Sequence, residues 1–188
     1  MSDYNKFAEE YERLTEKMEQ KTREHSYSLI TISLKGKKLL DVGCGSGLDA
    51  VHYTKEGAKV FGLDISEKEI AMARKKIIGN FVVGDMNKLP YTENSFDMVT
   101  SIYAIQSSSD VTEAINEMIR VAKKGAEILI VAKHPFRNLF EGNINDKKEN
   151  YFKQSKVTSH IFNRKIKLVE PSHTMMEYLH SSILKKAF

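Results

Sequence analysis

Three glycines lie close together in the segment LLDVGCGSGLD, residues 39–49, between an apolar run and a helix-compatible stretch. Glycine is costly in regular structure, so the cluster Gly43, Gly45 and Gly47 indicates either a tight turn or a ligand pressed against the main chain. A simple strand-to-helix turn usually needs only one glycine. We therefore interpret residues 43–47 as a ligand-binding loop.

The residues around these glycines restrict the class of ligand. The dinucleotide fingerprint is G-x-G-x-x-G, whereas the pattern here is G-x-G-x-G and Leu48 occupies the position of the fingerprint's third glycine. No G-K-[ST] follows, which excludes a nucleotide triphosphate loop. Asp41, just before the glycines, would repel a pyrophosphate but suits an ammonium group.

Strand and helix patterns alternate around this loop, from residue 37 to residue 133. Apolar strands are expected within residues 37–42, 58–65, 80–85, 94–105 and 126–132, and helices within residues 46–57, 66–77 and 110–125. Strands that are apolar on both faces are typical of parallel sheets covered by helices, so we predict a doubly wound α/β fold. Ligands of such folds bind at the carboxyl ends of the strands, where the glycine cluster lies.

Helix signals extend beyond this alternating region. An apolar face over residues 7–18 predicts an amphipathic helix, and a second helix is expected over residues 24–34. Thr174 and Glu177 have the spacing of a capping box, which predicts a helix over residues 174–188. Gly125 is expected to end the helix that begins near residue 110.

Composition and charge set outer bounds on the function. The 188 residues are enough for one domain with a sizeable core. No apolar run approaches the length of a membrane span, the N-terminus does not have the pattern of a signal peptide, and Cys44 is the single cysteine, so we expect a cytoplasmic protein. Residues 145–188 carry 9 Lys and Arg against 4 Asp and Glu, which suits either a solvated basic face or a nucleic-acid surface.

Four ordered segments resemble the class I S-adenosylmethionine-dependent methyltransferases, in particular the group with a domain of the methyltransferase 11 type. They are LDVGCGSG, VFGLDIS, VVGDMNKLPYTENSFDMVTSIYAI and EMIRVAKKGAEILIV. The similarity covers roughly residues 4–186. It implies a Rossmann-like fold with a mostly parallel sheet, S-adenosylmethionine as cofactor, and a small molecule as methyl acceptor.

The resemblance also implies roles for individual residues in cofactor binding. The loop from Gly43 to Gly47, with Cys44, Gly45 and Ser46 between, would receive the methionine part of the cofactor, and Asp41 would hold its ammonium group. Asp64 would accept hydrogen bonds from both ribose hydroxyls, which are charge-assisted. The remaining cofactor contacts are expected from Ile65, Asp85 and Met86 at the adenine and from the main chain of Ser101 at the methionine end. Tyr11 would either close over the cofactor or pack in the core as an aromatic residue at helical spacing.

Methyl transfer is a displacement at carbon that depends mainly on alignment of the acceptor with the methyl group, which can supply about 7–11 kcal/mol at best. Tyr103 and Gln106 follow the fourth strand and are expected to line the acceptor site. His134 follows the fifth strand and would serve as a general base if the acceptor arrives protonated. A turn-anchoring role for His134 remains the alternative, and no metal-ligand spacing is evident.

The expected organisation is one methyltransferase domain over residues 1–188. Residues 1–36 would form a helical cap, residues 37–133 the α/β core, and residues 134–188 a substrate-side lid with a C-terminal helix. Relatives continue into two more strands that this sequence does not provide, which would leave the fifth strand as an edge. We expect either the segment 156–170 or a homodimer, joined through the fifth strand or exchanged C-terminal segments, to cover it.

Two other functions remain open from the sequence. The basic C-terminal region would suit a methyltransferase for tRNA or rRNA. The short C-terminus would suit a protein that binds S-adenosylmethionine without turnover and serves as a scaffold. The fourth strand ends in SIYA rather than in the N/D-P-P-Y/F of amino-methylating nucleic-acid enzymes, so a small-molecule acceptor is favoured.

Overall fold

A computed structural model describes residues 4–134, 156–161, 166–171 and 173–179 of the chain. Its centre is a five-stranded parallel sheet in the order β3-β2-β1-β4-β5. The strands are β1 (Lys38–Val42), β2 (Lys59–Asp64), β3 (Asn80–Val83), β4 (Phe96–Ile102) and β5 (Ala122–Val131). This order and direction confirm the predicted doubly wound α/β fold.

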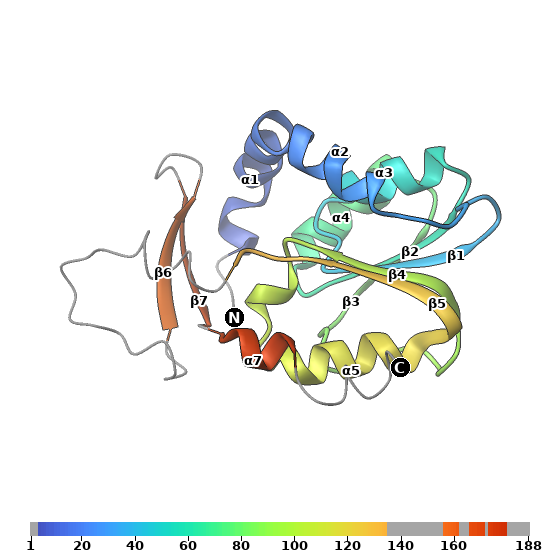
Figure 1. The fold of residues 1–188 in the computed structure, drawn as a ribbon. Helices are drawn as coiled ribbons and strands as arrows, with labels where there is room; N and C mark the ends of the chain where they lie inside the picture. The colour runs from blue at the N-terminus through green and yellow to red at the C-terminus, as the bar shows by residue number, and fades with distance from the viewer. Residues whose placement is uncertain (1–3, 135–155, 162–165, 172, 180–188) are drawn as a thin grey trace.

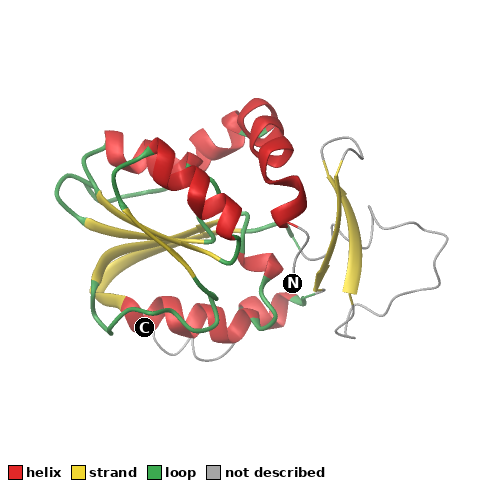
Figure 2. Cartoon of the chain, turned by 180° about the vertical axis from the view of Figure 1, so that it is seen from behind, coloured by secondary structure: helices red, strands yellow, loops and turns green. Residues whose placement is uncertain are grey.

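Helices cover both faces of the sheet (Figures 1 and 2). One layer contains α1 (Tyr4–Met18), α2 (Gln20–Ser28), α3 (Leu48–Lys55) and α4 (Glu67–Lys76), and the other contains α5 (Val111–Val121) and the short α7 (Met175–Tyr178). A 3-10 turn, η1 (Ile105–Ser107), leads from β4 towards α5. Within the residues that the structure describes, no helix is both long enough and apolar enough to span a membrane.

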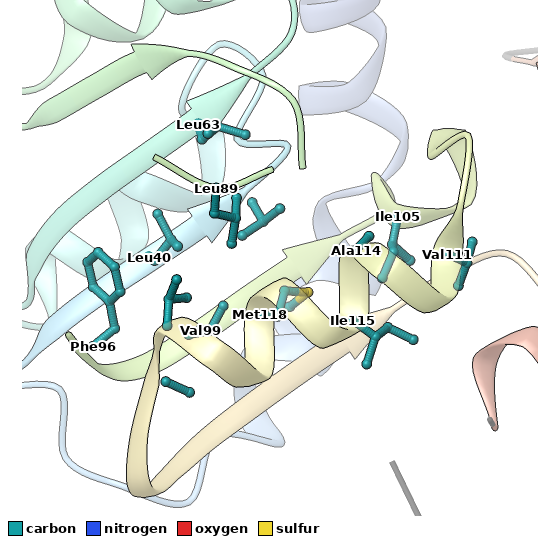
Figure 3. Packing of buried hydrophobic residues seen from close by; sticks show 13 residues of the cluster. Leu40, Leu63, Leu89, Phe96, Val99, Ile105, Val111, Ala114, Ile115 and Met118 are labelled. Carbon is teal, nitrogen blue, oxygen red and sulfur yellow. The ribbon is translucent and has the colours of Figure 1, made fainter. Parts of the chain in front are cut away.

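Side chains of the central strands alternate between two apolar clusters, one on each face of the sheet. Leu40 and Val99 pack with Met118 of α5, as the close view of this cluster shows (Figure 3). Leu39 and Met98, their neighbours in sequence, belong to the cluster on the opposite face. Because strand side chains point alternately to the two faces, both faces are apolar only when both are covered, which accounts for the near-continuous apolar runs in the sequence.

Predicted helix starts are confirmed, and two predicted helix bounds are wrong. Ser66 accepts a hydrogen bond from the Glu69 amide, as a capping box requires. The helix that was expected to end at Gly125 ends instead at Val121, because the next residue, Ala122, already pairs with Phe96 of β4. Gly125 lies inside β5 with a φ of 78°.

The second helix also differs from the expectation of residues 24–34. It spans residues 20–28 and ends before the β-branched run Ile30-Thr31-Ile32. Branching at Cβ disfavours a helix, and these residues have other partners. The Thr31 amide and hydroxyl both donate to the carboxylate of Glu127 on β5, and Ile30 and Ile32 pack on the cluster of Leu39.

The C-terminal part contains a separate antiparallel pair, β6 (Lys156–Ile161) and β7 (Ile166–Pro171). This pair lies beyond the carboxyl ends of the parallel strands, with β7 contacting η1 and α1 (Figures 1 and 2). The pair does not join the sheet, so the idea that residues 156–170 cover the edge of β5 is wrong. Among the strands that the structure describes, β5 pairs only with β4.

Candidate active site

The glycine loop connects β1 to α3 through three left-handed residues. Gly43, Gly45 and Gly47 have φ values of 74°, 50° and 82°, a region that side chains with a Cβ rarely adopt. The amides of Gly43 and Cys44 both donate to the carbonyl of Leu63 on β2, at 2.7 and 3.0 Å. The loop is therefore tied to the neighbouring strand while it turns into the helix.

Close packing explains why Gly43 in particular has no side chain. A Cβ built at this position would lie 2.2 Å from the Cβ of Ala104, in the segment after β4. β1 and β4 are the strands between which the chain reverses its order across the sheet, and such a switch point is where doubly wound folds bind ligands. The structure thus places the predicted loop at the expected crevice.

Asp64 ends β2 directly beside this loop. Its two carboxylate oxygens each accept a 2.9 Å hydrogen bond, one from the Gly45 amide and one from the Ser66 amide. Burial raises the pKa of the Asp64 carboxyl, and the same amide hydrogen bonds oppose that rise. The following residue, Ile65, leaves 55% of its surface exposed, as an apolar side chain would if it faced a ligand ring.

Glu69, in the first turn of α4, adds a second carboxyl group next to Asp64. The residue is only 4% exposed, and its Oε1 atom has no hydrogen-bond partner. Its Oε2 lies 3.6 Å from the position that a Cβ on Gly45 would occupy. Burial, assisted by the charge of Asp64, raises the pKa of Glu69 to about 8. The group is therefore protonated at neutral pH.

Asp41 and Ser101 lie deeper, on β1 and β4. Asp41 is 1% exposed and accepts a 3.1 Å hydrogen bond from the Thr100 hydroxyl through Oδ1, whereas its Oδ2 has no partner. Burial, then the nearby Asp49, raises the pKa of Asp41 well above its usual range. Ser101 is fully buried and its hydroxyl also lacks a partner. Two unpaired polar groups thus remain at the strand ends beside Gly43.

These features fit S-adenosylmethionine better than a phosphorylated cofactor. The Asp64 carboxylate beside the loop would repel a pyrophosphate but can accept hydrogen bonds from ribose hydroxyls, and Asp41 offers an unpaired oxygen to an ammonium group. The tight approach at Gly43, the unpaired Oδ2 of Asp41 and the exposed Ile65 are consistent with the methionine, ammonium and adenine positions that the resemblance implies.

Asp85 and Met86 follow β3, where the resemblance implies contacts with the adenine. Asp85 is exposed and accepts a 2.9 Å hydrogen bond from the Asn87 amide through one oxygen. Met86 is half-buried, and its Cε lies 3.6 Å from the position of a Cβ on Gly43. The structure therefore brings Met86 close to the loop, while Asp85 lies at the rim.

The residues predicted for the acceptor lie on the other side of Gly43. Tyr103 has a φ of 55°, unusual for a residue with a side chain, and its amide donates to the Val131 carbonyl at 2.7 Å. Gln106 donates to the Tyr103 carbonyl at 2.6 Å, and its Oε1 is buried without a partner. His134 is exposed, three residues beyond Val131. These three residues therefore follow the carboxyl ends of the neighbouring strands β4 and β5.

A group of residues from the N-terminal helices meets this site and was not predicted. Arg23 of α2 forms an ion pair with Asp49 in the first turn of α3, and Tyr27 donates to the same carboxylate at 2.6 Å. The Arg23 guanidinium also lies 5.8 Å from the centre of the Tyr103 ring. The sequence offered no signal for these pairs, since 22 and 26 residues separate the partners.

On the side of the loop that faces α4, Lys76 provides a similar set of polar contacts. Lys76 of α4 donates to the Ser46 hydroxyl at 3.3 Å and forms an ion pair with Glu12 of α1. Tyr11 belongs to the same helix, but its side chain lies outside the described atoms. Burial raises the pKa of the Cys44 thiol well above its usual range, which disfavours the thiolate form that a nucleophilic cysteine needs.

Comparison with known proteins agrees with this geometry. A family model described as a methyltransferase domain matches residues 40–130. The chain is 40% identical over 115 residues to norajmaline N-methyltransferase of Rauvolfia serpentina, covering 57% of this chain and 39% of that protein. It is 31% identical over 150 residues to demethylmenaquinone methyltransferase of Thermotoga maritima, covering 75% of this chain and 65% of that protein.

A solved methyltransferase in complex with the Haloferax volcanii Trm112 activator superposes with a TM-score of 0.67. It is 24% identical and the alignment covers 73% of this chain and 61% of that chain, a likeness that concerns the fold alone. The chain spans less than two thirds of the length of both curated relatives. The matched domain, the strand order and the loop geometry together support the resemblance of this chain to the class I S-adenosylmethionine-dependent methyltransferases.

Proposed function

We propose that this protein transfers a methyl group from S-adenosylmethionine to a small-molecule acceptor by direct displacement. The observation that carries the proposal is the glycine loop at the switch point, with Asp64 on one side and the buried Asp41 on the other. The relatives named above act on an alkaloid and on a quinone, which supports a small organic acceptor but does not select one.

The cofactor would supply a methyl group already bonded to a positively charged sulfur. The protein's part would be to hold the two reactants in line and to exclude water. Gly43 would allow close approach of the methionine chain, and Asp41 would accept hydrogen bonds from its ammonium group through the unpaired Oδ2. Asp64 would accept hydrogen bonds from the ribose hydroxyls with the lone pairs that the Gly45 and Ser66 amides leave free.

Binding of the demethylated product tests the cofactor assignment. S-adenosylhomocysteine is expected to raise the melting temperature and to bind in a calorimetric titration, because a ligand of the folded state stabilises it by mass action. NAD is expected to do neither. Asp64→Ala should weaken S-adenosylhomocysteine binding by about 1.5–3 kcal/mol, the contribution of hydrogen bonds to a charged group.

Glu93→Ala is the matched control for this titration. Glu93 is an exposed acid in the turn before β4, at the amino end of that strand, whereas the glycine loop follows the carboxyl end of β1. It should bind the product as the wild type does. Binding of NAD without binding of S-adenosylhomocysteine, or equal affinities in Asp64→Ala and Glu93→Ala, would contradict the proposed cofactor site.

For the acceptor side we propose that His134 acts as a general base when the acceptor arrives protonated. His134 follows β5, and the bond between the Tyr103 amide and the Val131 carbonyl brings the ends of β4 and β5 together. His134→Ala should lower the methylation rate about 10²–10⁴-fold while the affinity for S-adenosylhomocysteine stays unchanged. His25→Ala removes an exposed histidine of α2 and is the control; an equal rate in both variants would leave His134 with a structural role.

A further inference from the structure

His173 connects the C-terminal unit, defined here as β6, β7 and α7, to the loop that follows β4. The imidazole is 6% exposed. Its Nδ1 lies 2.8 Å from Oε2 of Glu177 in α7, and its Nε2 lies 2.9 Å from the carbonyl oxygen of Ser108. Ser108 directly follows η1, which contains Gln106.

Both partners of this ring are hydrogen-bond acceptors. A main-chain carbonyl never donates, and a carboxylate only accepts, so both ring nitrogens must carry a proton for both contacts to form. A neutral imidazole has one donor and one acceptor nitrogen, and would therefore turn a lone pair towards one of these oxygens. With Glu177 ionised, only the positively charged ring satisfies both contacts, and it then also forms an ion pair with Glu177.

Neighbouring groups do not remove this requirement. The Tyr178 ring meets the imidazole edge-on, with centroids 6.2 Å apart. Asp110 is the described acid that lies closest in sequence to Ser108. Its carboxylate accepts a hydrogen bond from the Glu113 amide at the start of α5. The Thr112 hydroxyl donates to the Glu177 carbonyl and adds a second, uncharged link between α5 and α7. Among these described groups, it is the protonation state of His173 that decides whether the ring can donate to both Glu177 and Ser108.

We propose that His173 is a positioning residue whose doubly protonated ring fastens the C-terminal unit to the acceptor-side loop, and that deprotonation loosens this contact. Through β7, the unit contacts α1 and η1, the turn that contains Gln106, at the carboxyl ends of the strands. The contact of His173 with Ser108 therefore sets how firmly the unit is held beside the proposed acceptor residues. Rising pH therefore opens the acceptor side, while the glycine loop, held by other residues, stays in place.

Amide hydrogen exchange of the full chain tests this without an acceptor or a cofactor. Protection factors, which divide out the intrinsic pH dependence of exchange, would be measured for residues 156–161 and 166–171 near pH 6 and pH 8.5. In the wild type they should fall about tenfold or more with rising pH, the loss expected for a hydrogen bond to a charged group. Protection of β1 amides should stay constant and shows that the core remains folded.

Glu177→Gln gives the sharpest comparison. The glutamine amide nitrogen can donate to an unprotonated Nδ1 while Nε2–H still donates to Ser108. Protection of the β6 and β7 amides in this variant should therefore no longer depend on pH. His173→Gln offers a donor to only one of the two acceptors and should be poorly protected at both pH values. His25→Gln should behave as the wild type.

Two results would overturn the proposal. One is a pH dependence of protection in Glu177→Gln equal to that of the wild type. The other is a nitrogen NMR spectrum in which the His173 ring carries a single proton under conditions where the amides of β6 and β7 are well protected.

Discussion

Gly43→Ala is expected to lower the free energy of unfolding by about 2–5 kcal/mol. A left-handed φ costs a residue with a Cβ about 1–2 kcal/mol, and the new methyl group would meet the Cβ of Ala104 at 2.2 Å. Relief of that overlap requires a shift of the segment after β4, and overpacking of this kind costs about 1–3 kcal/mol more. Urea unfolding followed by circular dichroism measures the difference.

Gly36→Ala is a nearly ideal control for this experiment. Gly36 also has a φ of 74°, but a Cβ there would meet no atom within 4 Å. It therefore isolates the backbone cost, about 1–2 kcal/mol. If the two variants lose the same stability, the contact between Gly43 and Ala104 does not constrain the loop, and the packing argument for this glycine is wrong.

Glu69→Gln is expected to make the protein more stable at alkaline pH. The pKa of Glu69 is raised to about 8 in the folded chain from an ordinary 4.5. The folded state therefore holds this proton more tightly than the unfolded state. The stability that the proton contributes is present in full below about pH 4.5 and is lost as the pH rises to about 8.

Glutamine imitates the protonated acid and cannot ionise, so its advantage over the wild type should grow with pH. Between about pH 5.5 and 8.5 the gain should reach roughly 3 kcal/mol, from about 1.4 kcal/mol for each pH unit. Glu67→Gln alters an exposed acid in the same helical turn and should show no such growth. A constant difference between Glu69→Gln and the wild type would mean that Glu69 is already ionised at neutral pH.

The sequence predicted the features that depend on local chemistry. Strand patterns placed all five parallel strands, and the Ser66 and Thr174 caps appear where their spacing indicated. These signals are local because capping and side-chain alternation involve residues within a few positions of one another. The left-handed glycines follow from the same logic, since few residues other than glycine adopt that conformation readily.

Features that depend on distant partners could not be predicted. The pair of Arg23 with Asp49 joins residues 26 positions apart, and the hydrogen bond between His173 and Ser108 joins residues 65 positions apart. The end of α5 at Val121 was missed because pairing with β4 outweighs the helix-stop signal of Gly125. Glu69 was read only as part of a cap, since its burial beside Asp64 exists only once α4 packs on the loop.

The polar contacts on the two flanks of the glycine loop have a consequence for affinity. Arg23 and Tyr27 hold Asp49 just after the loop, while Lys76 links Ser46 within it to Glu12. The conformational entropy of the loop is therefore lost when the N-terminal helices fold onto the core, before any ligand arrives. A ligand that meets a preorganised site loses less free energy on binding. The N-terminal helices α1 and α2 can therefore raise ligand affinity through their contacts with the loop and its flanks alone.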